Sequence, residues 1–112
     1  MQPKRVLLDE NLDVRFGREI PEHVISTVRG EGWTGVTNGN LLRLIEAAHF
    51  EVFVTADRNL EHQQTLSNRS FGTVVLVPRR LKLDHLRQLI PGLMRAILDV
   101  SAGEVLRVHP PA

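Results

Sequence analysis

The sequence predicts an α/β fold, a three-layer α/β/α sandwich around a mostly parallel sheet of about five strands. Short apolar runs alternate with longer segments in which apolar residues recur every three or four positions, as they do in amphipathic helices. The first run, Val6, Leu7 and Leu8, is apolar without interruption, which is typical of a strand covered on both faces. Strands that alternate with helices are joined by right-handed crossovers, so we expect the strands to run parallel.

Five segments have the composition of short strands. They are rich in β-branched and other apolar residues, and turn-forming or acidic residues separate them from the segments that follow. Pro78 closes the fourth of these segments, and Gly103 leads into the fifth. The expected strands are residues 6–8, 23–27, 51–55, 73–77 and 104–108.

Two helices are expected in the first half of the chain. The first extends from Asn11, a good capping residue, to about Ile20, where Pro21 stops it. A glycine-rich loop, residues 29–36, separates the second strand from the next helix, which Thr37 or Asn38 can cap. The apolar stripe of this second helix is Leu41, Leu44, Ile45 and Ala48.

The second half of the chain is expected to contain a short helix and a long one. The polar segment 60–70 has room for the short helix. Asp84 can cap the long helix, and Pro91 should kink it or split it in two, because proline removes a backbone donor. The apolar stripe of the long helix is Leu86, Ile90, Leu93 and Ile97.

Composition limits the class of protein. A chain of 112 residues suits one domain, 1–112, and 42% hydrophobic with 24% charged residues is typical of an ordinary globular protein. The formal net charge of +1 argues against a strongly cationic, nonspecific coat for nucleic acid. With no cysteine, disulfide frameworks and zinc-thiolate sites are excluded. No apolar run reaches the roughly 20 residues of a membrane span, and the amino terminus leads into a strand, so we expect a cytoplasmic protein.

Acidic residues follow two of the predicted strands, Asp9 after the first and Asp57 after the third. Because the carboxyl ends of parallel strands meet at one edge, these acids are expected to face one cleft. Glu10 adjoins Asp9, and the amides of Asn11, Asn38 and Asn59 are nearby in sequence, so the expected site is rich in oxygen. Such oxygen ligands suit Mg²⁺ or Mn²⁺, which can activate a water and offset charge on a phosphodiester. The alternative is that each acid merely forms a turn or a helix cap.

Basic residues gather after the fourth strand, at Arg79, Arg80 and Lys82. If this segment lies near the acidic edge, its cations can hold the phosphates of a nucleic acid. The alternative is a loop that is simply solvated.

Three short motifs, in order, resemble those of one family. Residues 6–12, Val-Leu-Leu-Asp-Glu-Asn-Leu, resemble the LLDENL opening of small PIN-like proteins, a branch of the PIN nuclease superfamily close to VapC-type toxins. Residues 35–38, Gly-Val-Thr-Asn, are similar to the Gly-x-Ser-Asp start of that family's second helix. Residues 53–60 are similar to its third-strand block, in which an acid follows a threonine by two positions.

The resemblance implies an α/β/α sandwich with an acidic, Mg²⁺- or Mn²⁺-dependent ribonuclease pocket. Asp9 and Asp57 fall on the positions of acidic metal ligands, with Glu10, Asn38 and Asn59 as further candidates. The expected function is that of an endoribonuclease, the toxin of a toxin–antitoxin pair. The expected partners are an RNA substrate, a small DNA-binding antitoxin protein and a second copy of the chain.

Two alternatives stay open. Asn38 and Asn59 stand where the family carries aspartates, which removes up to two negative charges and favours an inactive PIN-like domain that binds protein or RNA. A receiver-like phosphoacceptor domain also carries acids after its first and third strands. Such a domain needs a small hydroxyl residue after its fourth strand and a lysine after its fifth, which Val77, Pro78 and Arg107 do not supply.

Overall fold

Five strands pair in a single sheet in the computed structural model, which describes residues 2–111. Every neighbouring pair is parallel, so the expected mostly parallel sheet is in fact parallel throughout. Each predicted strand is present, with ends that differ by no more than one residue from the expected ones. The strands are β1 (Arg5–Leu8), β2 (Val24–Thr27), β3 (Val52–Thr55), β4 (Gly72–Leu76) and β5 (Val105–Val108).

The order of the strands across the sheet is β2-β1-β3-β4-β5. The chain leaves β1 toward one edge to form β2 and then returns past β1 to form β3 and the rest of the sheet. Connections that diverge in this way leave a crevice outside the carboxyl ends of β1 and β3. The first and third strands are therefore direct neighbours, and the acids that follow them flank this crevice.

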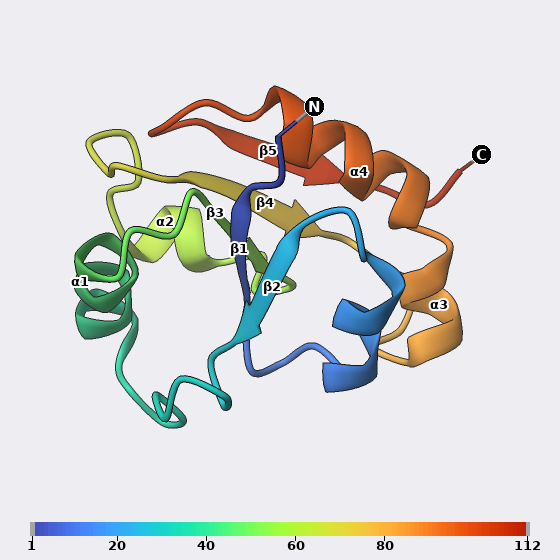
Figure 1. The fold of residues 1–112 in the computed structure, drawn as a ribbon, viewed down its shortest axis with the longest axis horizontal. Coiled ribbons are helices and arrows are strands. Elements are labelled where there is room, and N and C mark those ends of the chain that lie inside the picture. The colour runs from blue at the N-terminus through green and yellow to red at the C-terminus, as the bar shows by residue number, and fades with distance from the viewer. Residues whose placement is uncertain (1, 112) are drawn as a thin grey trace.

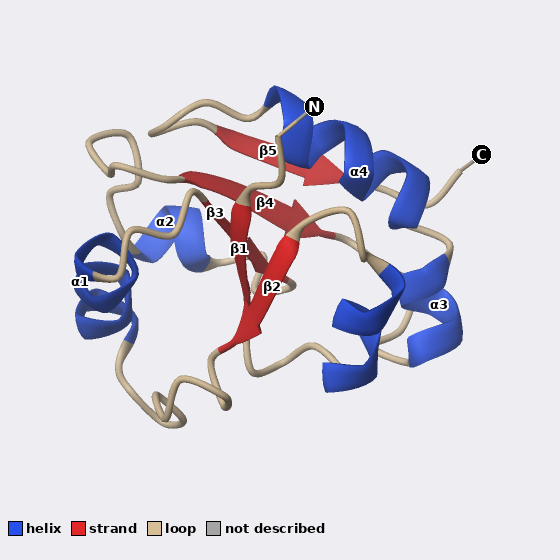
Figure 2. Ribbon diagram, viewed as in Figure 1, coloured by secondary structure: helices blue, strands red, loops and turns tan. Residues whose placement is uncertain are grey.

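Helices cover both faces of the sheet and complete the three expected layers (Figures 1 and 2). One face carries α1 (Asn38–Ala47) and α2 (Leu60–Gln63). The other carries the 3-10 helix η1 (Val14–Glu19), together with α3 (Leu83–Arg87) and α4 (Ile90–Asp99). Within residues 2–111, no helix has the length and apolar character needed to cross a membrane.

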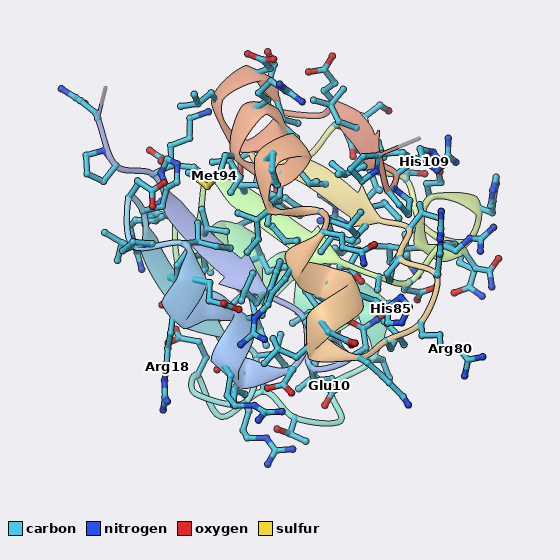
Figure 3. The ribbon with its side chains drawn as sticks, turned by 90° about the vertical axis from the view of Figure 1, so that its right-hand side faces the viewer. Glu10, Arg18, Arg80, His85, Met94 and His109 are labelled. Carbon is cyan, nitrogen blue, oxygen red and sulfur yellow. The ribbon has the colours of Figure 1, made fainter. Side chains whose placement is uncertain are left out.

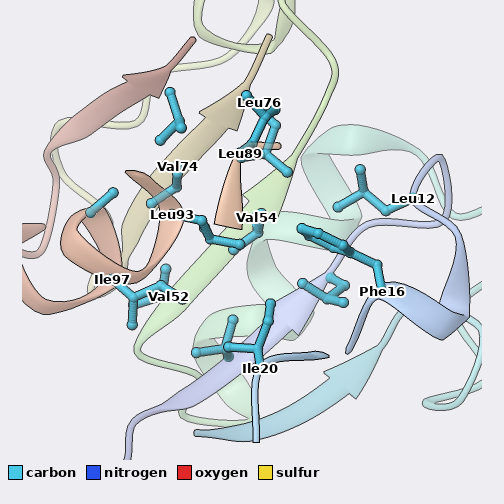
Figure 4. Packing of buried hydrophobic residues seen from close by; sticks show 14 of the residues in the cluster. Leu12, Phe16, Ile20, Val52, Val54, Val74, Leu76, Leu89, Leu93 and Ile97 are labelled. Atoms are coloured by element: carbon cyan, nitrogen blue, oxygen red, sulfur yellow. The ribbon is translucent and has the colours of Figure 1, made fainter. Parts of the chain in front are cut away.

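Side chains of the central strands alternate between the two faces of the sheet and form two apolar clusters. Val6 and Leu8 pack toward η1, α3 and α4, whereas Leu7, between them, packs toward α1 and α2. Figure 4 shows the first cluster, in which Phe16 of η1 and Leu93 of α4 lie against the sheet. Burial on both faces explains why these strands are apolar without interruption.

The first helix differs from the expectation. It is a 3-10 helix that begins at Val14, and its cap is Asp13, whose carboxylate accepts a hydrogen bond from the Arg15 backbone N–H at 2.9 Å. The Arg15 side chain also donates to Asp13, and together these bonds hold the pKa of Asp13 at about 2. Asn11, the expected cap, instead directs its side-chain oxygen toward the Ala56 N–H at 3.5 Å.

Pro91 splits the last helical segment, as expected. It lies in the first turn of α4, where its missing N–H leaves no helical bond unmade. The expected cap was wrong, since Lys82 holds the cap position of α3 and Asp84 lies in the first turn. The Asp84 carboxylate accepts a hydrogen bond from the His85 N–H at 3.0 Å, within that turn.

Candidate active site at the carboxyl ends of β1 and β3

Asp9 and Asp57 lie at the same edge of the sheet. Leu8 of β1 pairs with Val54 of β3, and the Asp9 N–H continues the ladder by donating to the Val54 carbonyl at 2.9 Å. Asp57 follows β3 by two residues. Because backbone pairing holds Asp9 and Asp57 follows the paired strand by only two residues, the sheet positions both acids and no long loop intervenes.

The hydroxyl of Thr55 joins the two acidic segments. It donates to the Asp9 carboxylate at 2.6 Å and accepts a hydrogen bond from the Asp57 backbone N–H at 3.0 Å. Thr55 is fully buried, so its rotamer is fixed by packing. The other Asp9 oxygen accepts a hydrogen bond from the Glu10 N–H at 2.8 Å, which further fixes the carboxylate.

The electrostatic environment of Asp9 is unfavourable to a negative charge. Burial raises the pKa of its carboxyl above the ordinary value of 3.8, and the charges of Glu10 and Asp57 raise it further. The hydrogen bonds from Thr55 and from the Glu10 N–H act in the opposite direction without cancelling the increase. A cation beside Asp9 would relieve this repulsion, which is how an acidic pair favours a metal ion.

A hollow of about 410 Å³ opens beside Asp9. Three of its lining residues are acids and one is an amide, and the others come from the segment between β1 and η1, from the start of η1, from the end of β2 and from the segment after β4. The polar lining residues are Asp9, Glu10, Asn11, Asp13, Thr27 and Arg29. Leu81 is one of the apolar lining residues. Of the two sequence-predicted acids, Asp9 lies in this wall and Asp57 lies beside it, within electrostatic reach of Asp9.

The other predicted ligands are distributed unequally. Glu10 lines the hollow, and its carboxylate accepts a hydrogen bond from the Gly35 N–H at 3.3 Å. Asn38 is the first residue of α1 and is not part of this wall among residues 2–111. Asn59 donates its backbone N–H to the Asp57 carboxylate at 3.0 Å, but it lines a different pocket. Neither amide therefore belongs to the wall of the hollow as described within residues 2–111.

The donors at this edge fit a divalent ion that keeps several waters. Within the described part of the chain, no three His, Cys, Asp or Glu side chains form a group able to enclose a metal. The usual donor set of Mg²⁺ nevertheless consists of one or two carboxylates together with waters and substrate phosphates. Asp9 and Asp57, with Glu10 nearby, supply such a set.

The basic segment after β4 lies next to the hollow. Arg79, Arg80 and Lys82 are exposed, and Leu81, between them, lines the same hollow as Asp9. In Figure 3, Glu10 lies at the bottom of the molecule and Arg80 lies at its right-hand side. Leu81 thus brings this segment to the hollow, whereas the three predicted phosphate-binding residues are not part of the wall described within residues 2–111.

Several site residues escaped sequence analysis. Thr55 was identified only as part of a strand, although a hydroxyl residue two positions before an acid at a strand end is a usable signal. Thr27 and Arg29 follow β2, whose carboxyl end also reaches this edge. Their participation follows from the position of β2 beside β1, which the sequence pattern does not specify.

Comparison with protein-family models, with curated proteins and with solved structures yields no match to this chain. Fold and site together define a small α/β domain with a five-stranded parallel sheet and acids at the carboxyl ends of two neighbouring strands. The case for a particular activity rests on these residues.

Replacement of Thr55 by valine is expected to lower the free energy of unfolding by about 1–3 kcal/mol, because the Asp9 carboxylate and the Asp57 N–H lose their partner. The pKa of Asp9 should rise further, since the hydroxyl bond lowers it in the wild type. Urea unfolding and NMR titration of the Asp9 carboxyl measure the two effects.

Thr73→Val is the matched control. Thr73 is also buried in a strand, β4, and its hydroxyl is not among the hydrogen-bond partners found for Asp9 and Asp57 within residues 2–111. Equal losses of stability in the two variants would show that the bridge from Thr55 contributes nothing.

Proposed function

We propose that this protein is a metal-dependent endoribonuclease of the PIN-like type. The observation that carries the proposal is the placement of Asp9 and Asp57 at the carboxyl ends of neighbouring parallel strands, joined through the Thr55 hydroxyl. The motif resemblance of residues 6–12, 35–38 and 53–60 supports the same class of enzyme.

Mg²⁺ or Mn²⁺ is the cofactor that these residues suit. When bound, the ion supplies positive charge that activates a water and offsets the charge that develops on the phosphodiester. Asp9 and Asp57 would hold the ion, and Thr55 keeps the Asp9 carboxylate in place. Glu10, exposed at the hollow, adds a negative charge beside Asp9 that would attract the ion.

The motif resemblance also supports a biological setting. The protein acts as the toxin of a toxin–antitoxin pair in the cytoplasm, where its RNA substrate is found, and a small DNA-binding antitoxin protein restrains it. Arg79, Arg80 and Lys82, exposed beside the hollow, bind the phosphates of the RNA.

The test of this function is cleavage of end-labelled RNA by the purified full chain. Cleavage should need Mn²⁺ or Mg²⁺, stop on addition of a chelator and resume when the metal is restored in excess. Cleavage that is unaffected by the chelator would contradict the proposal.

A PIN-like domain without catalysis, acting as a module that binds protein or RNA, is the second candidate. It is favoured by the lack of any group of three metal-binding side chains within residues 2–111. The two candidates differ in their response to metal, because only an ion that binds the folded state stabilises it.

Titration with Mn²⁺ is expected to raise the melting temperature of the wild type in a saturable way. One site occupied at 100 times its dissociation constant adds about 2.7 kcal/mol of stability. Asp57→Asn should lose most of this increase, because it removes one of the two carboxylates. A wild type whose melting temperature does not respond to Mn²⁺ would favour the binding module.

A further inference from the structure

A second hollow, of about 340 Å³, opens at the carboxyl ends of β3, β4 and β5. Its lining comes from the segment after β3, from α2 and from the ends of β4 and β5, which are far apart in sequence. Four of the six lining residues are arginines or histidines, and one is an amide. The lining residues are Arg58, Asn59, His62, Val77, Arg107 and His109.

The two arginines differ in their partners. Arg107 forms an ion pair with Glu61 of α2, which holds its guanidinium against the pocket wall. A guanidinium carries five N–H donors, so a bond to one carboxylate oxygen leaves others available. Arg58 is exposed and forms no ion pair with another residue of the range 2–111. The pocket therefore presents one oriented and one free guanidinium.

The basic pocket adjoins the acidic site. Asp57 and Arg58 are consecutive, so their Cα atoms are about 3.8 Å apart. Asp57 is tied to Thr55 and thus to Asp9, whereas Arg58 and Asn59 line the basic pocket. His109 marks the pocket at the end of β5 in Figure 3, and Arg80 lies below it on the same side of the molecule.

We propose that this pocket binds a backbone phosphate of an RNA strand whose scissile phosphate lies at Asp9 and Asp57, an inference that rests on the proposed function. Arginine presents donors in a planar fork that matches two phosphate oxygens. Val77 is the single apolar residue in the wall, so the chemistry of the pocket favours an anion over an apolar side chain. A phosphate held here fixes the register of the strand across the acidic site.

Binding of a fluorescent ten-nucleotide oligouridylate to the full chain tests this inference. The measurements are made in chelator, so that no metal-dependent cleavage can occur. Arg58→Ala should weaken binding about tenfold. It should also reduce the slope of log K against log salt concentration by about 0.7, the value for one phosphate contact to a single strand. Inorganic phosphate should compete with the RNA for binding to the wild type. It should no longer compete for binding to the Arg58→Ala variant.

The matched control is Arg18→Ala. Arg18 is also exposed, and it lies on η1, on the opposite side of the molecule from His109 in Figure 3. This variant loses the same charge, so RNA affinity and salt dependence should remain those of the wild type. Equal losses of RNA affinity in both variants would mean that only net charge matters, and would contradict the proposal that the pocket binds an RNA phosphate.

The remaining outcomes separate this inference from the proposed function. If Arg58→Ala binds RNA with wild-type affinity, the pocket does not bind an RNA phosphate, even if the protein cleaves RNA. Phosphate binding without RNA binding also overturns it, because the ligand is then a free ion. If the protein binds RNA through Arg58 but never cleaves it, RNA binding by the pocket is supported and the proposed nuclease activity is contradicted.

Discussion

Asp9→Asn is expected to abolish metal-dependent RNA cleavage. Asparagine has the shape of aspartate but no charge, so the proposed metal ion would lose one of its two carboxylate ligands. Weakening even the partners of metal ligands costs about 10- to 100-fold in metal affinity or activity, so the loss from Asp9 itself should be larger. The measurement is the rate of cleavage at saturating Mn²⁺.

Asp99→Asn is the control for this loss. Asp99 is exposed at the last residue of α4 and contributes nothing to the hollow beside Asp9. It should cleave RNA at the wild-type rate. Cleavage by Asp9→Asn at a rate close to that of Asp99→Asn would contradict the role of Asp9.

The stability of Asp9→Asn should equal or exceed that of the wild type at pH 7. The pKa of Asp9 is raised in the folded protein, so the folded state binds more protons than the unfolded state above the ordinary value of 3.8. Stability therefore falls as pH rises through this range. The neutral amide removes that cost, and the Thr55 hydroxyl can accept from it as well as donate.

Asp13, in the same hollow, should behave in the opposite way. Its pKa is lowered to about 2, so its charge stabilises the fold above the ordinary value and this contribution is lost as pH falls toward 2. Asp13→Asn is thus expected to destabilise the protein at pH 7. Unfolding in urea at pH 7, pH 4 and pH 2 distinguishes the two signs, because the effect of Asp9 changes above pH 3.8 and the effect of Asp13 changes between pH 3.8 and about 2.

Gly103→Ala is expected to lower the free energy of unfolding by about 3 kcal/mol or more, a large part of an ordinary 5–15 kcal/mol. Gly103 has a φ of +81°, and a Cβ there would lie 2.4 Å from the Ser67 carbonyl oxygen. That oxygen is backbone, so it cannot rotate away. The Gly103 N–H also donates to the Phe71 carbonyl at 3.0 Å, which holds the turn against this neighbour.

Gly32→Ala measures the cost of the left-handed backbone conformation alone, without a steric clash. Gly32 has a φ of +80°, but a Cβ there would have no heavy atom within 4 Å. The expected loss is only the left-handed backbone penalty of about 1–2 kcal/mol. Similar losses in the two variants would show that the contact with Ser67 relaxes without cost.

The strands and the placement of the two acids could be predicted from sequence because both depend on local pattern. A continuous apolar run such as Val6 to Leu8 indicates a strand buried on both faces. Once the strands are parallel, their carboxyl ends must share an edge, which brings Asp9 and Asp57 together. The break between α3 and α4 could be predicted because proline cannot donate a backbone hydrogen bond inside a helix, and Pro91 therefore lies in the first turn of α4.

Side-chain partners could not be predicted, since they depend on which segments meet. Asp13 replaces Asn11 as the cap because its carboxylate reaches both the backbone and side chain of Arg15. Asn59 follows an acid in sequence, yet it lines the basic pocket. That pocket unites the ends of three strands with α2, so no local pattern reveals it.

The pairing of β1 with β3 also has a consequence for folding. The hydrogen bond from Thr55 to Asp9 spans 46 residues of chain, and contacts between segments that far apart form after local ones. A nascent chain that has not yet released β3 has no joined pair of acids. During synthesis, therefore, a growing chain carries an incomplete site until the sheet closes around β1.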